Sequence, residues 1–96
     1  MVKEMVVKRF KDILKSRLMS ANELAIISGV NRSTVYSMLK NERKDIKIST
    51  IKKLCDGLEI TLGEFFSTYE FDNLEQEIKW LKNFLGKLKF IATIIL

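Results

Sequence analysis

The stretch from Ser20 to Leu39 constrains the fold most, because it carries start and stop signals for two short helices. It reads SANELAIISGVNRSTVYSML. Ser20 and Glu23 form an S-x-x-E capping box, in which each side chain accepts a hydrogen bond from the other residue's backbone N–H. Gly29 tolerates the left-handed conformation of a tight helix exit, and Asn31 is a good N-cap for a second helix. The predicted helices span about Ala21–Ser28 and Arg32–Lys40.

The second of these helices has an apolar and a polar side. Val35, Met38 and Leu39 recur at spacings of three and four, as in a helix that packs on a core. The opposite side carries an arginine, a lysine, a tyrosine and two hydroxyl residues: Arg32, Ser33, Tyr36, Ser37 and Lys40. A short helix with such a face, in a chain of net charge +5, suits a DNA major groove.

Composition favours one small all-α domain. The chain has 96 residues, no proline and only four glycines, which argues against a turn-rich β-sandwich. Charge is uneven: residues 1–60 hold thirteen Lys and Arg against seven Asp and Glu, whereas residues 61–96 hold four against five. The basic excess thus accompanies the two-helix stretch, as polyanion binding requires, although excess lysine also occurs on simple solvated surfaces.

Several functional classes are excluded or disfavoured. The chain has no histidine and one cysteine, Cys55, so we expect no metal site, no disulfide and no histidine-dependent catalysis. Glu23, Glu64 and Glu75 are expected to serve as helix caps, which leaves no paired acid site and predicts no enzyme and no cofactor. Neither a signal peptide nor a run of about 18 uncharged apolar residues is present. We therefore expect a cytoplasmic protein.

The remaining helices follow from the same signals. A first helix is expected from Val2 to about Arg17, with Val6, Phe10, Ile13 and Leu14 on one side. Residues 41–47 read as an exposed loop with Arg43, Lys44 and Lys47 as its basic members. Ser49 is expected to cap a fourth helix, Thr50–Asp56, which Gly57 ends. Thr61 and Glu64 form a second capping box for a short fifth helix through Phe65 and Phe66.

Residues from about Phe10 to Phe66 resemble the phage-repressor, or Xre-type and Cro-like, helix-turn-helix family of transcriptional regulators. The stretches MSANELAIISGVNRSTVYSML and ISTIKKLCDGLEITLGEFF carry the resemblance in the order and spacing of that family. It implies a five-helix, lambda-repressor-like DNA-binding domain, here residues 1–68, with an additional C-terminal helix. It also implies a homodimeric regulator that binds double-stranded DNA at a palindromic operator.

The resemblance assigns roles residue by residue. Bases would be read by Arg32, Ser33, Ser37 and Tyr36. The DNA backbone would be contacted by Ser20, Asn22, Asn31, Thr34, Lys40, Arg43 and Lys44. Chemistry supports Arg32, because its planar fork fits guanine O6 and N7. The serines are short and read bases weakly, so we expect specificity to depend heavily on Arg32 and on DNA shape.

The chain departs from the family at three places. Ala21 replaces a common glutamine that contacts a phosphate, a role open to Ser20 or Asn22. Leu14 and Leu39 replace an ion pair, and we expect them to touch, since hydrophobic replacement of a buried pair is often neutral or stabilising. Asn41 and Ile46 replace a glycine and a proline of the loop, and asparagine tolerates the left-handed conformation.

Residues 69–96 form a C-terminal helix and apolar tail in this interpretation. Asp72 and Glu75 would start the helix, and its last seven residues would end it or form a short strand. Its apolar residues form a heptad seam, Leu74, Ile78, Leu81, Leu85 and Leu88. A second flank widens this seam: Trp80, Phe84 and Ile91. An exposed seam of this size marks an interface. We expect it to pair with a second copy; folding back on its own chain and, less favoured, lying on a membrane surface are the alternatives.

The leading hypothesis is therefore a sequence-specific, dimeric DNA-binding regulator, most simply a repressor. The rival is a protein-interaction module, such as an antitoxin-like or antirepressor-like chain whose C-terminal helix binds a different protein. Binding of random duplex DNA at low salt distinguishes the two.

Overall fold

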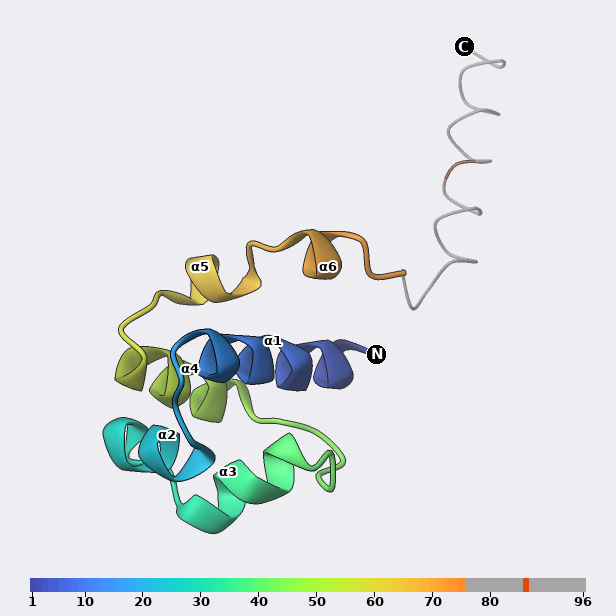
Figure 1. Ribbon diagram of the computed structural model, residues 1–96. Coiled ribbons are helices and arrows are strands. Elements are labelled where there is room, and N and C mark those ends of the chain that lie inside the picture. Colours follow the sequence, from blue (N-terminus) through green and yellow to red (C-terminus); the bar gives the residue numbers. More distant parts are fainter. Residues whose placement is uncertain (76–85, 87–96) are drawn as a thin grey trace, which may run out of the picture.

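The computed structural model describes residues 1–75 and Gly86. Those residues contain six helices and no strand (Figure 1), so the all-α prediction is confirmed. The helices are α1 (Val2–Ser16), α2 (Ala21–Ser28), α3 (Arg32–Leu39), α4 (Ile48–Gly57), α5 (Leu62–Phe66) and α6 (Tyr69–Asp72). The first five lie within two residues of their predicted bounds, which is the usual uncertainty of a helix end.

The helices surround one hydrophobic core. In Figure 1, α2 and α3 form one side of the molecule, α5 and α6 form the opposite side, and α1 and α4 lie between them. The buried core residues come from α1 to α5 and the turns between them: Val6, Val7, Phe10, Ile13, Leu14, Leu24, Ala25, Val35, Met38, Ile51, Leu54, Cys55, Leu58 and Phe65. Cys55 is fully buried in this core, where it packs as a small hydrophobic residue. Leu39 packs against the same core as Leu14, whereas a direct contact between the two stays a prediction.

Three of the predicted caps are confirmed. Ser20 and Glu23 exchange both hydrogen bonds of a capping box at the start of α2, and Thr61 and Glu64 do so at α5. Asn31 caps α3. These local signals act within one turn, so they operate largely independently of tertiary packing.

The predicted start of α4 is wrong by two residues. Lys47, not Ser49, is the N-cap, and its carbonyl accepts from the backbone N–H groups of Thr50 and Ile51. Ile46 packs against the core and so fixes where the preceding loop ends. Ser49 consequently lies inside the first turn, where its hydroxyl caps nothing.

Gly57 does not end α4 through a left-handed conformation; it is the last residue inside the helix. A Cβ at this position would lie 2.8 Å from Ser28 Cα and 2.9 Å from the Ile27 carbonyl oxygen of α2. The helix is ended instead by Glu59, whose φ is +58°, while the Ile60 N–H donates to the Cys55 carbonyl at 3.0 Å. Gly57 is therefore needed for the close approach of α2 and α4.

The same left-handed exit ends α1 and α3. Leu18 has a φ of +54° and Asn41 a φ of +57°. The residue after each of them donates its backbone N–H to the carbonyl five residues earlier in the chain. Met19 donates to the Leu14 carbonyl, and Glu42 donates to the Ser37 carbonyl. The expectation that Asn41 would keep the turn without glycine is confirmed.

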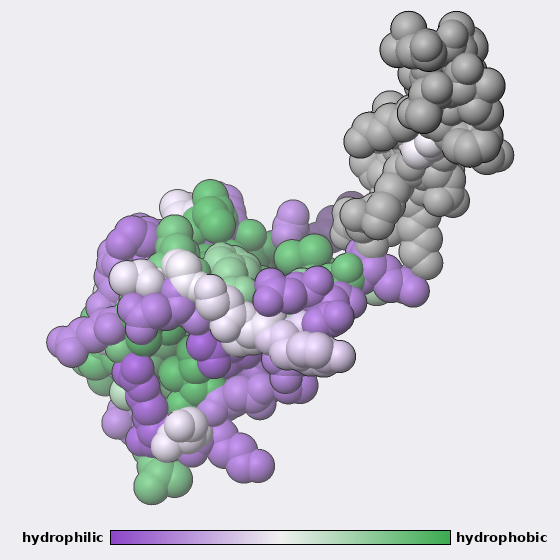
Figure 2. All heavy atoms as spheres, turned by 90° about the horizontal axis from the view of Figure 1, so that it is seen from above, coloured by the Kyte–Doolittle hydropathy of each residue, from purple (hydrophilic) through white to green (hydrophobic). Residues whose placement is uncertain are grey.

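Hydrogen bonds and an aromatic contact hold α5 against α1, and aromatic contacts hold α6 against α5. Arg9 Nε donates to the Phe65 carbonyl at 2.9 Å, and Arg9 Nη2 donates to the Glu64 carbonyl at 3.1 Å. Phe65 stacks against Phe10 with ring centroids 4.5 Å apart, and Phe71 of α6 lies 4.9 Å from Phe66. Figure 2, viewed from the α5–α6 side, shows hydrophobic residues between hydrophilic ones on this face.

The predicted start of the tail helix is also wrong. Asp72 is the last residue of α6, and Thr68 is its N-cap, with Thr68 Oγ1 accepting from the Phe71 N–H at 3.3 Å. The contacts of Phe71 with Phe65 and Phe66 place this extra turn before the tail.

Leu74 is half-buried. The other predicted interface residues lie outside the described residues: Ile78, Trp80, Leu81, Phe84, Leu85, Leu88 and Ile91. Within residues 1–75 and Gly86, no helix is both long and apolar enough to cross a membrane.

Candidate nucleic-acid interface

One side of α3 packs against the core, and the other side lies at the surface of the domain. Val35 and Met38 are 0% and 1% exposed, respectively. The outer side carries the residues that the sequence predicted for base reading; Arg32 and Ser33 are exposed, and Tyr36 and Ser37 are half-buried. The structure thus brings these four side chains onto one short helix, as their spacing predicted.

Two hydrogen bonds organise the start of α3. Asn31 Oδ1 accepts from the Ser33 backbone N–H at 2.9 Å and from the Ser33 hydroxyl at 2.8 Å. The Asn31 carboxamide NH2 group remains available to a ligand. Because the Ser33 hydroxyl already donates its hydrogen to Asn31, it can only accept a hydrogen bond from a ligand.

Arg32 lies over the ring of Tyr36, one helical turn away. The guanidinium carbon is 5.4 Å from the ring centroid, a cation–π distance. Arg32 makes no hydrogen bond or ion pair within residues 1–75, so its N–H donors stay free for acceptors. Its planar fork suits the paired acceptors of guanine, O6 and N7.

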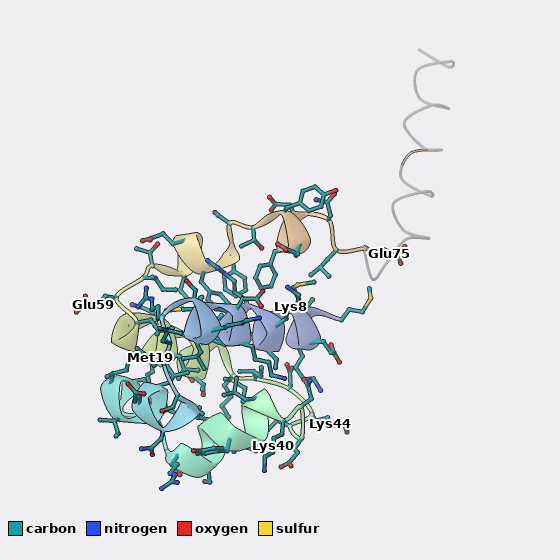
Figure 3. All side chains as sticks on the ribbon, viewed as in Figure 1. Lys8, Met19, Lys40, Lys44, Glu59 and Glu75 are labelled. Carbon is teal, nitrogen blue, oxygen red and sulfur yellow. The ribbon has the colours of Figure 1, made fainter. Side chains whose placement is uncertain are left out.

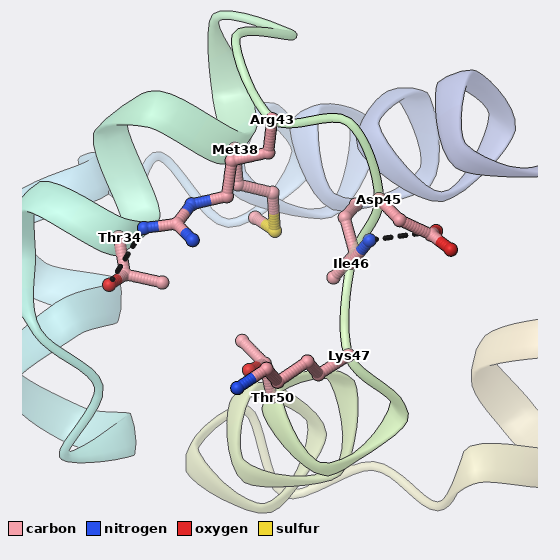
Figure 4. A pocket seen from close by; sticks show the side chains of 7 residues that line it. All are labelled: Thr34, Met38, Arg43, Asp45, Ile46, Lys47 and Thr50. Carbon is pink, nitrogen blue, oxygen red and sulfur yellow. Dashed lines mark hydrogen bonds between the residues drawn. The ribbon is translucent and has the colours of Figure 1, made fainter.

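Arg43 returns from the loop onto the polar side of α3. Its Nε donates to Ser37 Oγ at 2.8 Å, and its Nη2 donates to Thr34 Oγ1 at 3.3 Å. The Ser37 hydroxyl in turn donates to the Thr34 carbonyl at 3.2 Å. Sequence reasoning placed Arg43 near the end of α3, but only the structure joins it to two α3 side chains. Figure 4 shows Arg43 reaching across to Thr34.

A hollow of about 210 Å³ lies between α3, the loop and the first turn of α4. It is lined by Thr34, Met38, Arg43, Asp45, Ile46, Lys47 and Thr50 (Figure 4). The Asp45 carboxylate accepts from the Ile46 backbone N–H at 2.8 Å and so closes the loop locally. Arg43 and Lys47 supply positive charge, and two threonines supply hydroxyls, which suits an anionic or polar ligand.

Thr50 is a lining residue whose position the sequence did not reveal. Lys47 was expected in the exposed loop beside the end of the third helix, whereas Thr50 was expected only as the first residue of the fourth helix. The place of Thr50 beside α3 depends on where α4 starts, and the misplaced Ser49 cap concealed it.

The remaining predicted backbone contacts lie at the two ends of the two-helix unit. Ser20 is engaged in its capping box, whereas the half-buried Asn22 makes no side-chain hydrogen bond within the part of the chain that the structure describes. Lys40 and Lys44 are exposed at the end of α3 and in the following loop (Figure 3). Cations in these places suit phosphate contacts.

Nothing among the described residues points to catalysis or metal binding. No group of three or more His, Cys, Asp or Glu side chains in residues 1–75 could hold a metal ion. Burial raises the pKa of the Cys55 thiol, which keeps it in the unreactive protonated form at neutral pH.

Comparison with known proteins agrees with this geometry. The family model of the Cro/C1-type HTH DNA-binding domain matches residues 9–70, which include most of α1 and all of α2 to α5. No curated protein and no solved structure matches the chain.

Proposed function

Because the chain belongs to the Cro/C1-type helix-turn-helix DNA-binding family, we propose that it is a transcriptional repressor that binds a palindromic operator as a homodimer. That it is a DNA-binding regulator follows from the family. Such domains are typically non-enzymatic, and we propose no catalytic role. The repressor role, the dimer and the operator symmetry are the proposed parts.

One observation carries the proposal for DNA recognition: α3 carries an exposed arginine on its outer side, and further exposed cations lie at its end and in the next loop. Arg32 is proposed to read a guanine, with Ser33, Tyr36 and Ser37 beside it in the major groove. Backbone contacts are assigned to Ser20, Asn22, Asn31, Thr34, Lys40, Arg43 and Lys44. None of these cations takes part in an ion pair within residues 1–75, so their charge is available to phosphates.

Dimerisation is assigned to residues 69–96, and DNA binding to residues 1–68. The apolar residues of the tail supply the contact surface, and the short heptad-like seam is reinforced by Trp80 and Phe84. A two-fold dimer would place two copies of α3 about 34 Å apart, one helical turn of DNA. Occupation of an operator that overlaps a promoter then excludes the polymerase.

Salt-dependent retardation of random duplex DNA tests the binding itself. The chain should bind with a steep negative slope of log affinity against log salt, and Lys44→Ala should reduce the magnitude of the slope by about one. Lys8→Ala is the matched control, because Lys8 pairs with Asp12 and lies beside α6 residues, away from α3. Absence of DNA binding at low salt would overturn the proposal and favour a protein-interaction module.

Arg32→Ala tests base reading. The cognate site should lose about 1–3 kcal/mol of binding free energy, and the preference should flatten at one base pair. An equal loss on every sequence would make Arg32 a phosphate contact instead.

Truncation after Phe71 tests the tail, with Leu81→Glu in the full chain as the milder variant. Sedimentation should report a dimer for the unmodified chain and a monomer for both variants. A truncated chain that stays dimeric at micromolar concentration would refute the tail interface. Selection of sites from a random duplex pool would report half-site sequence, palindromy and spacing together.

A further inference from the structure

We propose that Arg43, which lies outside the recognition helix, reads a base, and that Ser37 and Thr34 position it. This inference rests on the proposed function, since it concerns how the same surface discriminates among DNA sequences. It changes the roles of three residues: Arg43 reads a base instead of contacting the backbone, and Thr34 and Ser37 act through Arg43 rather than on the DNA directly.

The guanidinium of Arg43 is fixed in its plane. Arg43 uses one N–H at Nε and one at Nη2 on the two hydroxyls, at 2.8 Å and 3.3 Å. Thr34 and Ser37 are three residues apart, so both hydroxyls project from one side of α3. Two hydrogen bonds from one edge of a planar group leave it little freedom to rotate.

The edge of the guanidinium that remains free is the one that binds guanine. An arginine has five N–H donors, so three remain: both at Nη1 and one at Nη2. Nη1 and Nη2 form the fork that binds guanine O6 and N7 together. Within residues 1–75 these remaining donors have no hydrogen-bond partner, and Arg43 lines the hollow between α3 and α4 (Figure 4).

The loop that carries Arg43 is held in place by the protein itself, before DNA binds. Lys3 Nζ, from α1, donates to the Arg43 carbonyl at 3.0 Å, and the Glu42 N–H donates to the Ser37 carbonyl at 3.0 Å. Neither Glu42 nor Asp45 pairs with Arg43, which keeps its full charge. Ordering the side chain in advance reduces the entropy lost on binding.

The Ser37 hydroxyl donates to the Thr34 carbonyl and accepts from Arg43, so its one hydrogen is used within the protein. A serine in this state contributes little direct reading. Its contribution to specificity is to orient the longer side chain, which reaches farther than serine can.

Arg43→Lys is the decisive variant, because lysine keeps the charge but lacks the fork. Wild type and variant are each used to select sites from a random duplex pool, and binding is then measured on the selected site and its single-base variants. We expect the variant to keep the salt slope and to lose about 5- to 150-fold of discrimination at one G·C pair. Ser37→Ala should reduce discrimination at that same pair, and Ser37→Thr, which keeps the hydroxyl, should restore it. Lys8→Ala is the charge control.

Two results would overturn the proposal. If Arg43→Lys selects the same sites with unchanged discrimination while Arg43→Ala weakens all sequences alike, Arg43 is a phosphate contact. If wild type enriches no sequence at all, the proposed sequence-specific function fails together with this inference. The first result leaves the proposed function intact, so the two failures are distinguishable.

Discussion

Gly57 offers a sharp test of how the DNA-binding unit is held to the rest of the domain. It lies in the last turn of α4 against the end of α2. A Cβ built there would lie 2.8–2.9 Å from three backbone atoms of Ile27 and Ser28, closer than real Cβ contacts. Backbone atoms cannot rotate away as a side chain can. Gly57→Ala must therefore push α2 away from α4 or distort a helix end.

Two opposing effects set the magnitude. Alanine in a helix is about 1 kcal/mol more favourable than glycine, whereas overpacking a tight contact costs about 1–3 kcal/mol. Because the clash is with backbone, the upper part of that range applies, and we expect a net loss of about 1–2 kcal/mol in the free energy of unfolding. Each kcal/mol lowers Tm by about 4–8 °C in a domain of this size.

Two other glycines serve as matched controls in urea unfolding followed by circular dichroism. At Gly63 the nearest atom to a new Cβ is Thr61 Oγ1 at 3.7 Å, so Gly63→Ala should be neutral or stabilising by up to about 1 kcal/mol. Gly29 has open space but a φ of +67°, so Gly29→Ala should cost about 1–2 kcal/mol through backbone strain. A Gly57→Ala chain as stable as wild type would refute the close packing of α2 on α4.

Further stability predictions follow from single residues. Leu18→Gly should stabilise the fold by about 1 kcal/mol, with Leu18→Ala near neutral, because glycine relieves the left-handed φ of +54° at a side chain that is 92% exposed. Arg9→Met should lower the free energy of unfolding by about 1.5–3 kcal/mol in chemical unfolding, because it removes two charged hydrogen bonds to the end of α5 but keeps an apolar stem. An unchanged free energy of unfolding would show that these hydrogen bonds do not stabilise the domain. Cys55 predicts a pH effect: burial raises the pKa of the folded thiol above its ordinary value of 9.0, so the thiol of the unfolded chain ionises first and stability falls as the pH rises above about 9. The fall should be shallower in Cys55→Ala, and an equal slope in both chains would contradict it.

Much of the local structure was predictable because its causes lie within one turn of chain. The capping boxes at Ser20 and Thr61 and the cap at Asn31 need only residues three or fewer positions apart. The apolar spacings of α1 to α4 then placed the core, and the exposed face of α3 followed as its complement. The resemblance to the regulator family rested on these same features.

The errors arose where a distant contact decided a local outcome. Ser49 has the chemistry of a cap, but the packing of Ile46 against the core starts α4 earlier. Gly57 has the chemistry of a helix end, but its role is to admit the backbone of α2. Asp72 lost its predicted capping role because the aromatic contacts of Phe71 extend the domain by the turn α6.

The sequence by itself determined that α3 is a short helix with a polar outer side, since periodicity and capping are properties of the chain alone. Only the tertiary structure decided what lies beside it. Arg43 is six residues from Ser37 and nine from Thr34, and no local rule directs its side chain to either. That contact exists because the left-handed turn at Asn41 and the bond from Lys3 return the loop across α3. The recognition surface is therefore built from a helix that the sequence specifies and an arginine that folding delivers to it.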